Sequence, residues 1–182
     1  MRWEFFMIPA VALSGMPAIA GAYYLTLGQA QNLLFPGATF TKDFHTLTDS
    51  QINQIVSEVD VKVWNRKLRI WQVSTGGWFI IDQVKGKDDW VSYALGLDET
   101  GAVTGIEILE CWEQYNQIRL PEWRAQFMGA RHGEFIGTRY GRMQEGSEIQ
   151  TITGTTLSSV HITEGITRLL ATFAVIIAPR VP

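Results

Sequence analysis

The chain has 182 residues, of which 46% are hydrophobic, 12% aromatic and 18% charged, and this suits one domain that buries a sizeable core. A formal net charge of −3 argues against a general nucleic-acid binder, and the low charge and aromatic content exclude a mainly disordered chain. The single cysteine, Cys111, excludes an intramolecular disulfide framework, a four-thiolate zinc site and a CxxCH haem attachment site.

The first twenty residues have the features of an export signal. Arg2 supplies a positive charge, residues 5–13 form an apolar run, and Ala18-Ile19-Ala20 matches the small-x-small pattern before a signal-peptidase site. We predict a cleaved signal peptide over residues 1–20 and a single mature domain over residues 21–182, which places the protein in the periplasm or elsewhere outside the cytoplasm. An uncleaved anchor and a buried core segment are the alternatives.

Two short helices are predicted at the start of the mature chain. Thr26 is a plausible N-cap of a helix that runs to Phe35 and stops at Pro36-Gly37. Thr48 is placed to cap a second helix that continues to Val56.

Beyond Asp60 the apolar residues alternate with the period of β-strands. Gly76-Gly77 and Asp98-Glu99-Thr100-Gly101 are turn signals between such runs. Short turns between successive strands are typical of an antiparallel meander. The predicted strands cover residues 61–64, 68–73, 78–84, 90–97 and 103–110.

The last third predicts a short helix, a long loop and a long C-terminal helix. Pro121 suits the first turn of a helix that continues to Met128, and residues 129–147 are predicted to form a loop. A helical pattern then runs from Ser158 to Ala178, and it is too short in its fully apolar part to cross a bilayer, which favours a core helix. Its apolar stripe consists of Ile162, Ile166, Leu169, Leu170, Phe173 and Ile177. The predicted fold class is α+β, an antiparallel β-meander flanked by short N-terminal helices and a longer C-terminal helix.

Common catalytic motifs are missing from the sequence. It contains no G-x-S-x-G elbow and no P-loop. His45, His132 and His161 do not stand at metal-ligand spacing from one another or from Cys111, so no metal site and no catalytic residue are predicted.

A stretch rich in hydroxyl residues, 152–159, comes immediately before the C-terminal helix. Its simpler interpretation is an N-cap region, where Ser and Thr bond to free backbone N–H groups. The other interpretation is an anion site, because a helix N-terminus presents N–H donors and partial positive charge to a phosphate.

The same stretch resembles the flavinylation motif of the FMN-binding domain family, whose pattern runs roughly Asp-x-x-Ser/Thr-Gly-Ala-Thr-x-Thr/Ser. Thr153-Gly154 fills the Ser/Thr-Gly pair, Thr155 stands in the alanine position, Thr156 is the acceptor, and Leu157-Ser158 complete the pattern. Gln150 stands where the motif has its leading Asp. The resemblance implies an FMN cofactor attached covalently to Thr156 as a phosphoester by a dedicated flavin transferase, which takes FMN from FAD.

The resemblance extends from about Tyr24 to Leu170. Residues 77–82, 95–101 and 103–110 look like the family's central hairpins, and Glu113 corresponds to a family glutamate near the flavin. The family includes the small extracytoplasmic flavin subunits of the Rnf and sodium-pumping quinone reductase complexes. The resemblance therefore implies an exported electron-transfer flavoprotein with a membrane-bound redox partner, a carrier rather than a stand-alone catalyst.

Two groups of side chains are candidates for further flavin contacts. One group is aromatic and is predicted either to flank the ring or to pack in the core: Tyr115, Trp123 and Phe127. The other group is cationic and consists of Arg119, Arg124, Arg131, Arg139 and Arg142. In this hypothesis one or two of these arginines contact the phosphate, and the others form a solvated face.

Two other functions stay open at this point. The first is a flavin-dependent reductase of a small acceptor such as a ferric complex or a quinone. The second is a secreted adaptor with a degenerate motif and no flavin.

Overall fold

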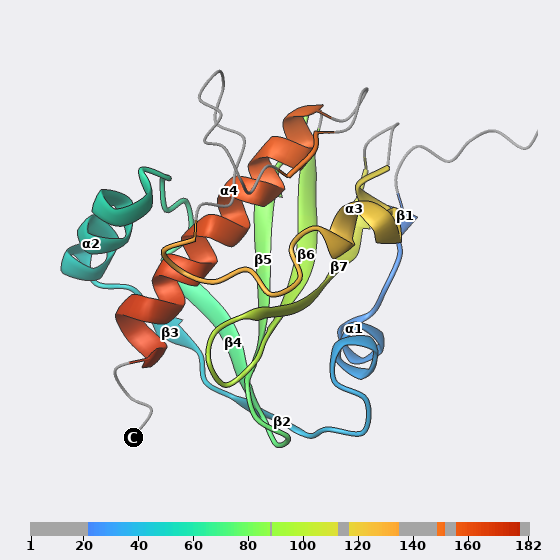
Figure 1. Cartoon of the computed structure of the whole chain (residues 1–182), viewed down its shortest axis with the longest axis horizontal. Coiled ribbons are helices and arrows are strands. Elements are labelled where there is room, and N and C mark those ends of the chain that lie inside the picture. Colours follow the sequence, from blue (N-terminus) through green and yellow to red (C-terminus); the bar gives the residue numbers. More distant parts are fainter. Residues whose placement is uncertain (1–21, 88, 113–116, 135–148, 152–155, 179–182) are drawn as a thin grey trace, which may run out of the picture.

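The computed structural model describes residues 22–87, 89–112, 117–134, 149–151 and 156–178. The fold is α+β, as predicted: an antiparallel sheet carries helix α4 along one face and helix α1 against the other (Figure 1). In chain order the elements are β1 (Ala22–Tyr23), α1 (Leu27–Leu34), β2 (Phe40–Lys42), β3 (His45–Thr46), α2 (Asp49–Val59), β4 (Lys67–Val73), β5 (Trp78–Lys85), β6 (Trp90–Leu97), β7 (Val103–Cys111), the 3-10 turn η1 (Gln117–Arg119), α3 (Pro121–Ala125), α4 (Thr156–Thr172) and the π-helical turn η2 (Phe173–Ile177).

The sheet has the strand order β1-β7-β6-β5-β4-β2, and β3 also pairs with β4. Strands β4 to β7 form the predicted antiparallel meander, each pairing with the next along the chain. Strands β5 and β6 pair along their full length, from Trp78 opposite Leu97 to Lys85 opposite Trp90. The longest strands therefore lie in the middle of the sheet, below α4.

Two of the predicted turns require glycine. Gly77 has a φ of +86°, and a Cβ there would lie 2.1 Å from the carbonyl oxygen of Leu97. Gly101 has a φ of +82°, and a Cβ there would lie 2.4 Å from the ring of Phe173. Both turns thus combine a left-handed backbone with a close approach that any side chain would obstruct.

The two predicted N-terminal helices begin at the predicted caps. Thr26 accepts a hydrogen bond from the N–H of Gln29 (3.3 Å), and the Gln29 side chain accepts one from the N–H of Thr26 (2.8 Å). Thr48 and Gln51 form the same reciprocal pair at the start of α2. Each pair satisfies two N–H groups at a helix start, which is the reason these sequences begin helices here.

One predicted strand is wrong. Residues 61–64 alternate in sequence, but the chain is irregular from residue 60 to residue 66. Both edges of β4, the strand that follows this run, are already occupied, by β5 on one side and by β2 and β3 on the other, so the run cannot pair there. The short strands β1, β2 and β3 were not predicted, because two or three residues carry too little alternation to detect.

The helical predictions of the last third need smaller corrections. Helix α3 ends at Ala125, and the residues up to Met128 continue as turns. Helix α4 begins two residues before the predicted start and passes into η2. The six residues of its predicted apolar stripe are all buried.

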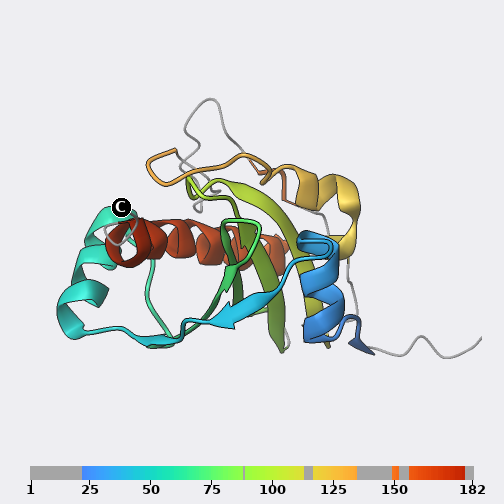
Figure 2. The ribbon, with the colours of Figure 1, turned by 90° about the horizontal axis from the view of Figure 1, so that it is seen from below.

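Helix α4 is a core helix that also has the length and composition of a membrane span. Residues 156–177 reach a mean hydropathy of 1.5 over an 18-residue window, and 72% of that window is buried inside the protein. Figure 2 shows α4 running across the sheet, with α2 beside one end of it. Packing against the sheet therefore accounts for its apolar sequence.

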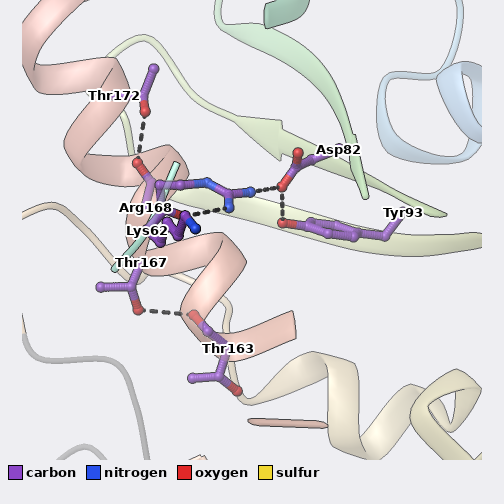
Figure 3. Close-up of polar contacts among 7 residues, drawn as sticks. All are labelled: Lys62, Asp82, Tyr93, Thr163, Thr167, Arg168 and Thr172. Atoms are coloured by element: carbon purple, nitrogen blue, oxygen red, sulfur yellow. Dashed lines mark hydrogen bonds and ion pairs between the residues drawn. The ribbon is translucent and has the colours of Figure 1, made fainter. Parts of the chain in front are cut away.

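A charged cluster lies between α4 and the sheet (Figure 3). Arg168 is 6% exposed and forms an ion pair with Asp82 of β5. Tyr93 of β6 donates its hydroxyl to the same carboxylate (2.8 Å), and the Arg168 guanidinium also donates to the carbonyl oxygen of Lys62 (3.3 Å). The buried charges are thus paired and hydrogen-bonded, as a low-dielectric setting requires.

Gly165 lets α4 approach this cluster closely. A Cβ at Gly165 would lie 2.5 Å from the Tyr93 hydroxyl oxygen and 2.8 Å from Val84 Cγ1. We expect Gly165→Ala to lower the free energy of unfolding by about 1–3 kcal/mol through overpacking, although Ala favours a helix interior over Gly by about 1 kcal/mol. Urea unfolding measures the change.

The matched control is Gly28→Ala in α1, where nothing lies within 4 Å of the added Cβ. This variant should be neutral or gain up to about 1 kcal/mol. Equal effects of the two substitutions on stability would contradict the close approach.

Tyr93 is expected to make stability fall at high pH. Burial, and then the charge of Asp82, raise the pKa of the Tyr93 hydroxyl well above its usual value of 10.0. Above pH 10 the unfolded chain releases this proton while the folded chain retains it. The contribution of Tyr93 to the free energy of unfolding is therefore fully present below pH 10, and the free energy of unfolding falls by about 1.4 kcal/mol per pH unit above it. Tyr93→Phe removes this slope. Urea unfolding of both proteins between about pH 9 and about pH 11 tests it, and parallel curves would show that Tyr93 titrates normally.

Candidate functional site

The entrance of α4 carries the part of the predicted attachment motif that the structure describes. Thr156 is the first residue of α4 and is exposed, Leu157 is half-buried, and Ser158 is fully buried. Ser159 is also buried and donates its hydroxyl to the carbonyl oxygen of Thr156 (2.9 Å). Among the described hydroxyl residues of this first turn, Thr156 is the one that solvent and a ligand can reach.

The hydroxyls further along α4 bond back to the helix. Thr163 donates to the carbonyl oxygen of Ser159 (2.8 Å), and Thr167 donates to that of Thr163 (2.9 Å). Thr172 donates to the carbonyl oxygen of Arg168 (2.8 Å). These side chains satisfy local backbone groups.

The entrance of α4 is held against the end of β5. His161, on the second turn of α4, has its Nδ1 2.5 Å from the carbonyl oxygen of Lys85, the last residue of β5. A carbonyl only accepts, so Nδ1 carries the proton. Five residues of helix rise about 8 Å, so Thr156 lies that far beyond this contact along the helix axis.

The segment that leads to the motif is attached to α3. Trp123 donates its ring N–H to the carbonyl oxygen of Gln150 (2.8 Å), and the Gln126 side chain accepts from the N–H of Gln150 (2.8 Å). Ile149 is 5% exposed. The position where the motif has its leading Asp is therefore held through its backbone, which any residue provides.

Two of the aromatic candidates belong to the core. Trp123 is 4% exposed, Phe127 is 0% exposed, and their rings meet edge to face with centroids 5.1 Å apart. Core packing, one of the two predicted roles, thus applies to both. Tyr115 lies outside the described residues.

The described arginines of the cationic group already have protein partners. Arg124 pairs with Glu107 and donates to the carbonyl oxygen of Ile106 (2.5 Å). The guanidinium of Arg119 lies 3.6 Å from the ring centroid of Tyr24. Arg131 donates to the Thr100 hydroxyl (2.6 Å). Arg139 and Arg142 lie outside the described residues.

Several predicted residues are outside what the structure describes. They are Glu113, Thr153, Gly154 and Thr155 of the predicted site, together with the predicted signal peptide over residues 1–20. Their predicted roles stay predictions.

The histidines lie apart, each with its own neighbour. His45 pairs with Asp43 (2.8 Å between Nε2 and Oδ1), and His132 pairs with Glu58 (3.2 Å between Nε2 and Oε2). Among the residues that the structure describes, no three His, Cys, Asp or Glu side chains are grouped to hold a metal ion.

Sequence reasoning missed two features. The first is the ion pair of Arg168 and Asp82. Two sequence features could have predicted it: Arg168 is a charge within a predicted helix that is largely apolar, and Asp82 falls between the core positions Ile80 and Val84 of a strand. The second is a set of exposed tryptophans. The sequence pattern around them does not predict that they are exposed. They are Trp64, Trp90 and Trp112.

The α4 entrance combines an exposed hydroxyl with the start of a fixed helix. An exposed threonine stands at the positive end of a helix dipole, where a phosphate is favoured. The helix itself is held in place by burial and by its contacts with β5, which fixes the position of Thr156.

Comparison with known proteins agrees with the class that the motif predicted. No family model matches the chain. The chain is 27% identical over 177 residues to a curated protein, in an alignment that covers 88% of this chain and 84% of the relative. That relative is one of the subunits of the Na⁺-translocating ferredoxin:NAD⁺ oxidoreductase complex of Acetobacterium woodii. The similarity over most of both chains confirms the predicted relationship to subunits of such complexes.

The attachment of the 149–151 segment to α3 can be tested through Trp123. Trp123→Phe keeps a ring in the core and removes the N–H that bonds to Gln150, so we expect a loss of about 1 kcal/mol in unfolding free energy. Amide hydrogen exchange at residues 149–151 should become faster, as mass spectrometry would detect.

Trp78→Phe is the control, because Trp78 is buried to a similar extent and packs on Phe173 with ring centroids 4.9 Å apart. It should lower stability without changing exchange at 149–151. Unchanged exchange in Trp123→Phe would show that the Trp123 contact does not hold this segment.

Proposed function

We propose that the chain is an extracytoplasmic electron-transfer subunit that binds FMN and carries it as a phosphoester on Thr156. The observation that supports this most directly is the exposed Thr156 at the start of a buried, fixed helix. The relationship to a subunit of an oxidoreductase complex supports the electron-transfer role. When bound, FMN supplies electron transfer through its isoalloxazine ring.

The attachment chemistry needs little from the chain itself. The Thr156 oxygen forms a bond to the FMN phosphorus of FAD, the pyrophosphate bond breaks, AMP leaves, and the hydroxyl proton is released to the transferase or to water. The chain contributes an accessible oxygen and the N–H groups of the first helical turn, which favour the negative phosphate. A separate flavin transferase supplies the catalytic groups.

The neighbours of Thr156 have distinct roles in this proposal. Leu157 is half-buried and offers an apolar surface beside the anchor, whereas Ser158 is buried in the first turn. Thr153, Gly154 and Thr155 complete the sequence that the transferase recognises, and Glu113 lies near the ring. A covalent tether keeps the flavin at high effective concentration without a deep pocket.

The proposed setting is the outer side of a membrane. Residues 1–20 act as the export signal, and a membrane-bound redox partner exchanges electrons with the flavin. The supporting observation is that the relative is a subunit of an ion-translocating complex. Outside the cytoplasm a freely dissociating flavin would be lost by diffusion, which gives covalent attachment its advantage.

The decisive measurement is the intact mass of the full chain produced together with its flavin transferase. We expect one FMN-sized increment in the wild type and none in Thr156→Ala, because the alanine has no oxygen to esterify. Thr156→Ser retains a hydroxyl and should retain part of the modification. In-gel flavin fluorescence after denaturation should follow the same order.

Thr151→Ala is the control, since Thr151 is another exposed threonine and stands at a position where the motif accepts any residue, so this variant should be modified like the wild type. Flavin retained by Thr156→Ala through denaturation would place the attachment elsewhere. An unmodified, colourless wild type would contradict the proposal and favour the secreted adaptor without flavin. Turnover of an added ferric complex or quinone by the reduced protein would favour a reductase.

A further inference from the structure

Three exposed tryptophans form a band around one end of the sheet. Trp64, Trp90 and Trp112 are 67%, 46% and 42% exposed. Trp64 and Trp90 line one groove of about 180 Å³, and Trp90 and Trp112 line another of about 250 Å³. The two grooves share Trp90, so the three rings belong to one continuous surface, which we call the tryptophan band.

The tryptophan band is also where the lysines gather. Four of the five lysines of the chain lie between residues 62 and 87, and all four are exposed. The Lys62 ammonium lies 4.1 Å from the ring centroid of Trp64, and that of Lys85 lies 5.9 Å from the ring centroid of Trp90. Lys67 lines the groove between Trp64 and Trp90.

The band is positive although the whole chain is negative. Arg69 adds a fifth cation to the lysines, and Asp89 and Glu110 are the carboxylates that line the second groove. Asp82 does not count toward the surface charge, because Arg168 neutralises it. The cations therefore outnumber the carboxylates in a chain whose formal net charge is −3.

The described chain begins beside this band. Ala22 pairs with Cys111, the neighbour of Trp112. The start of the described chain is therefore at the same end of the sheet as the band.

We propose that the tryptophan band docks on an anionic bilayer surface. Trp is enriched at membrane–water interfaces because its ring is apolar and its N–H is polar. Long lysine side chains reach the headgroups from beside such rings, and each contributes attraction to anionic lipid. The proposal does not depend on flavin attachment. The band shares only the backbone of Lys85 with the α4 entrance, through its carbonyl oxygen and His161, whereas the Lys85 side chain lies beside Trp90.

A protein partner fits the composition of the band less well. Protein interfaces are enriched in Trp but depleted in Lys, whereas this band contains most of the lysines of the chain. A bilayer surface favours both residue types together. The surface whose charge is complementary to that of the band is therefore a layer of anionic lipid headgroups.

The test is sedimentation of the full chain with two kinds of vesicle, phosphatidylcholine alone and phosphatidylcholine mixed with phosphatidylglycerol. We expect partition into the anionic vesicles to be at least about tenfold stronger, because each lysine near the surface contributes about a factor of five. The N-terminal segment is the same in the wild type and in every variant, so differences between them report the band. The ratio should collapse at about 1 M salt, where the Debye length is about 3 Å.

Variants separate charge from aromatic contact. The triple variant Lys62→Gln, Lys85→Gln, Lys87→Gln should bring the ratio close to one, whereas Lys42→Gln, outside the band, should leave it unchanged. The pair Trp64→Ala, Trp90→Ala should weaken binding to anionic vesicles several-fold, whereas Leu33→Ala, an exposed apolar residue of α1, should not.

These changes are at exposed positions, and thermal unfolding confirms that each variant is folded. Equal partition of the wild type into both vesicles, or an unchanged ratio in the lysine variant, would overturn the proposal. A photo-cross-linker at position 64 that captures a protein and no lipid would also overturn it. None of these outcomes alters the mass test of Thr156.

Discussion

The ion pair between Arg168 and Asp82 fixes how α4 sits on the sheet. A buried ion pair contributes little net stability, because desolvation offsets much of the attraction, but breaking it leaves an uncompensated charge at a cost of about 3–5 kcal/mol. Rotating α4 by one residue would carry Arg168 away from Asp82 and Tyr93. The cluster therefore specifies one orientation of a helix whose apolar faces alone would tolerate several.

That orientation positions the candidate site. Since α4 is rigid and also bonded to the end of β5 through His161, the orientation set at Arg168 determines where Thr156 stands. In the proposed function the threonine needs no pocket of its own, because a covalent tether would replace the contacts that a dissociable cofactor requires. Gly165 belongs to the same arrangement, since it brings the helix close enough for the cluster to form.

The proposed membrane docking and the proposed flavin use different parts of one end of the sheet. The α4 entrance meets β5 at Lys85, and the tryptophan band begins at Lys85 and Trp90. A surface that orients the domain on a bilayer beside the flavin would shorten the path to a membrane-bound partner. Both features depend on the β5–β6 pair, which aligns Lys85 with Trp90.

Local patterns in the sequence determined the capped helices α1 and α2, the β4–β7 meander and the apolar stripe of α4, because each depends on near neighbours in the chain. They also determined the motif that singles out Thr156. Only the tertiary structure decided that residues 61–64 have no strand partner, that Trp123 holds Gln150, and that Arg168 meets Asp82. Those contacts join residues far apart in the chain, so their energies exist only once the sheet and α4 have packed together.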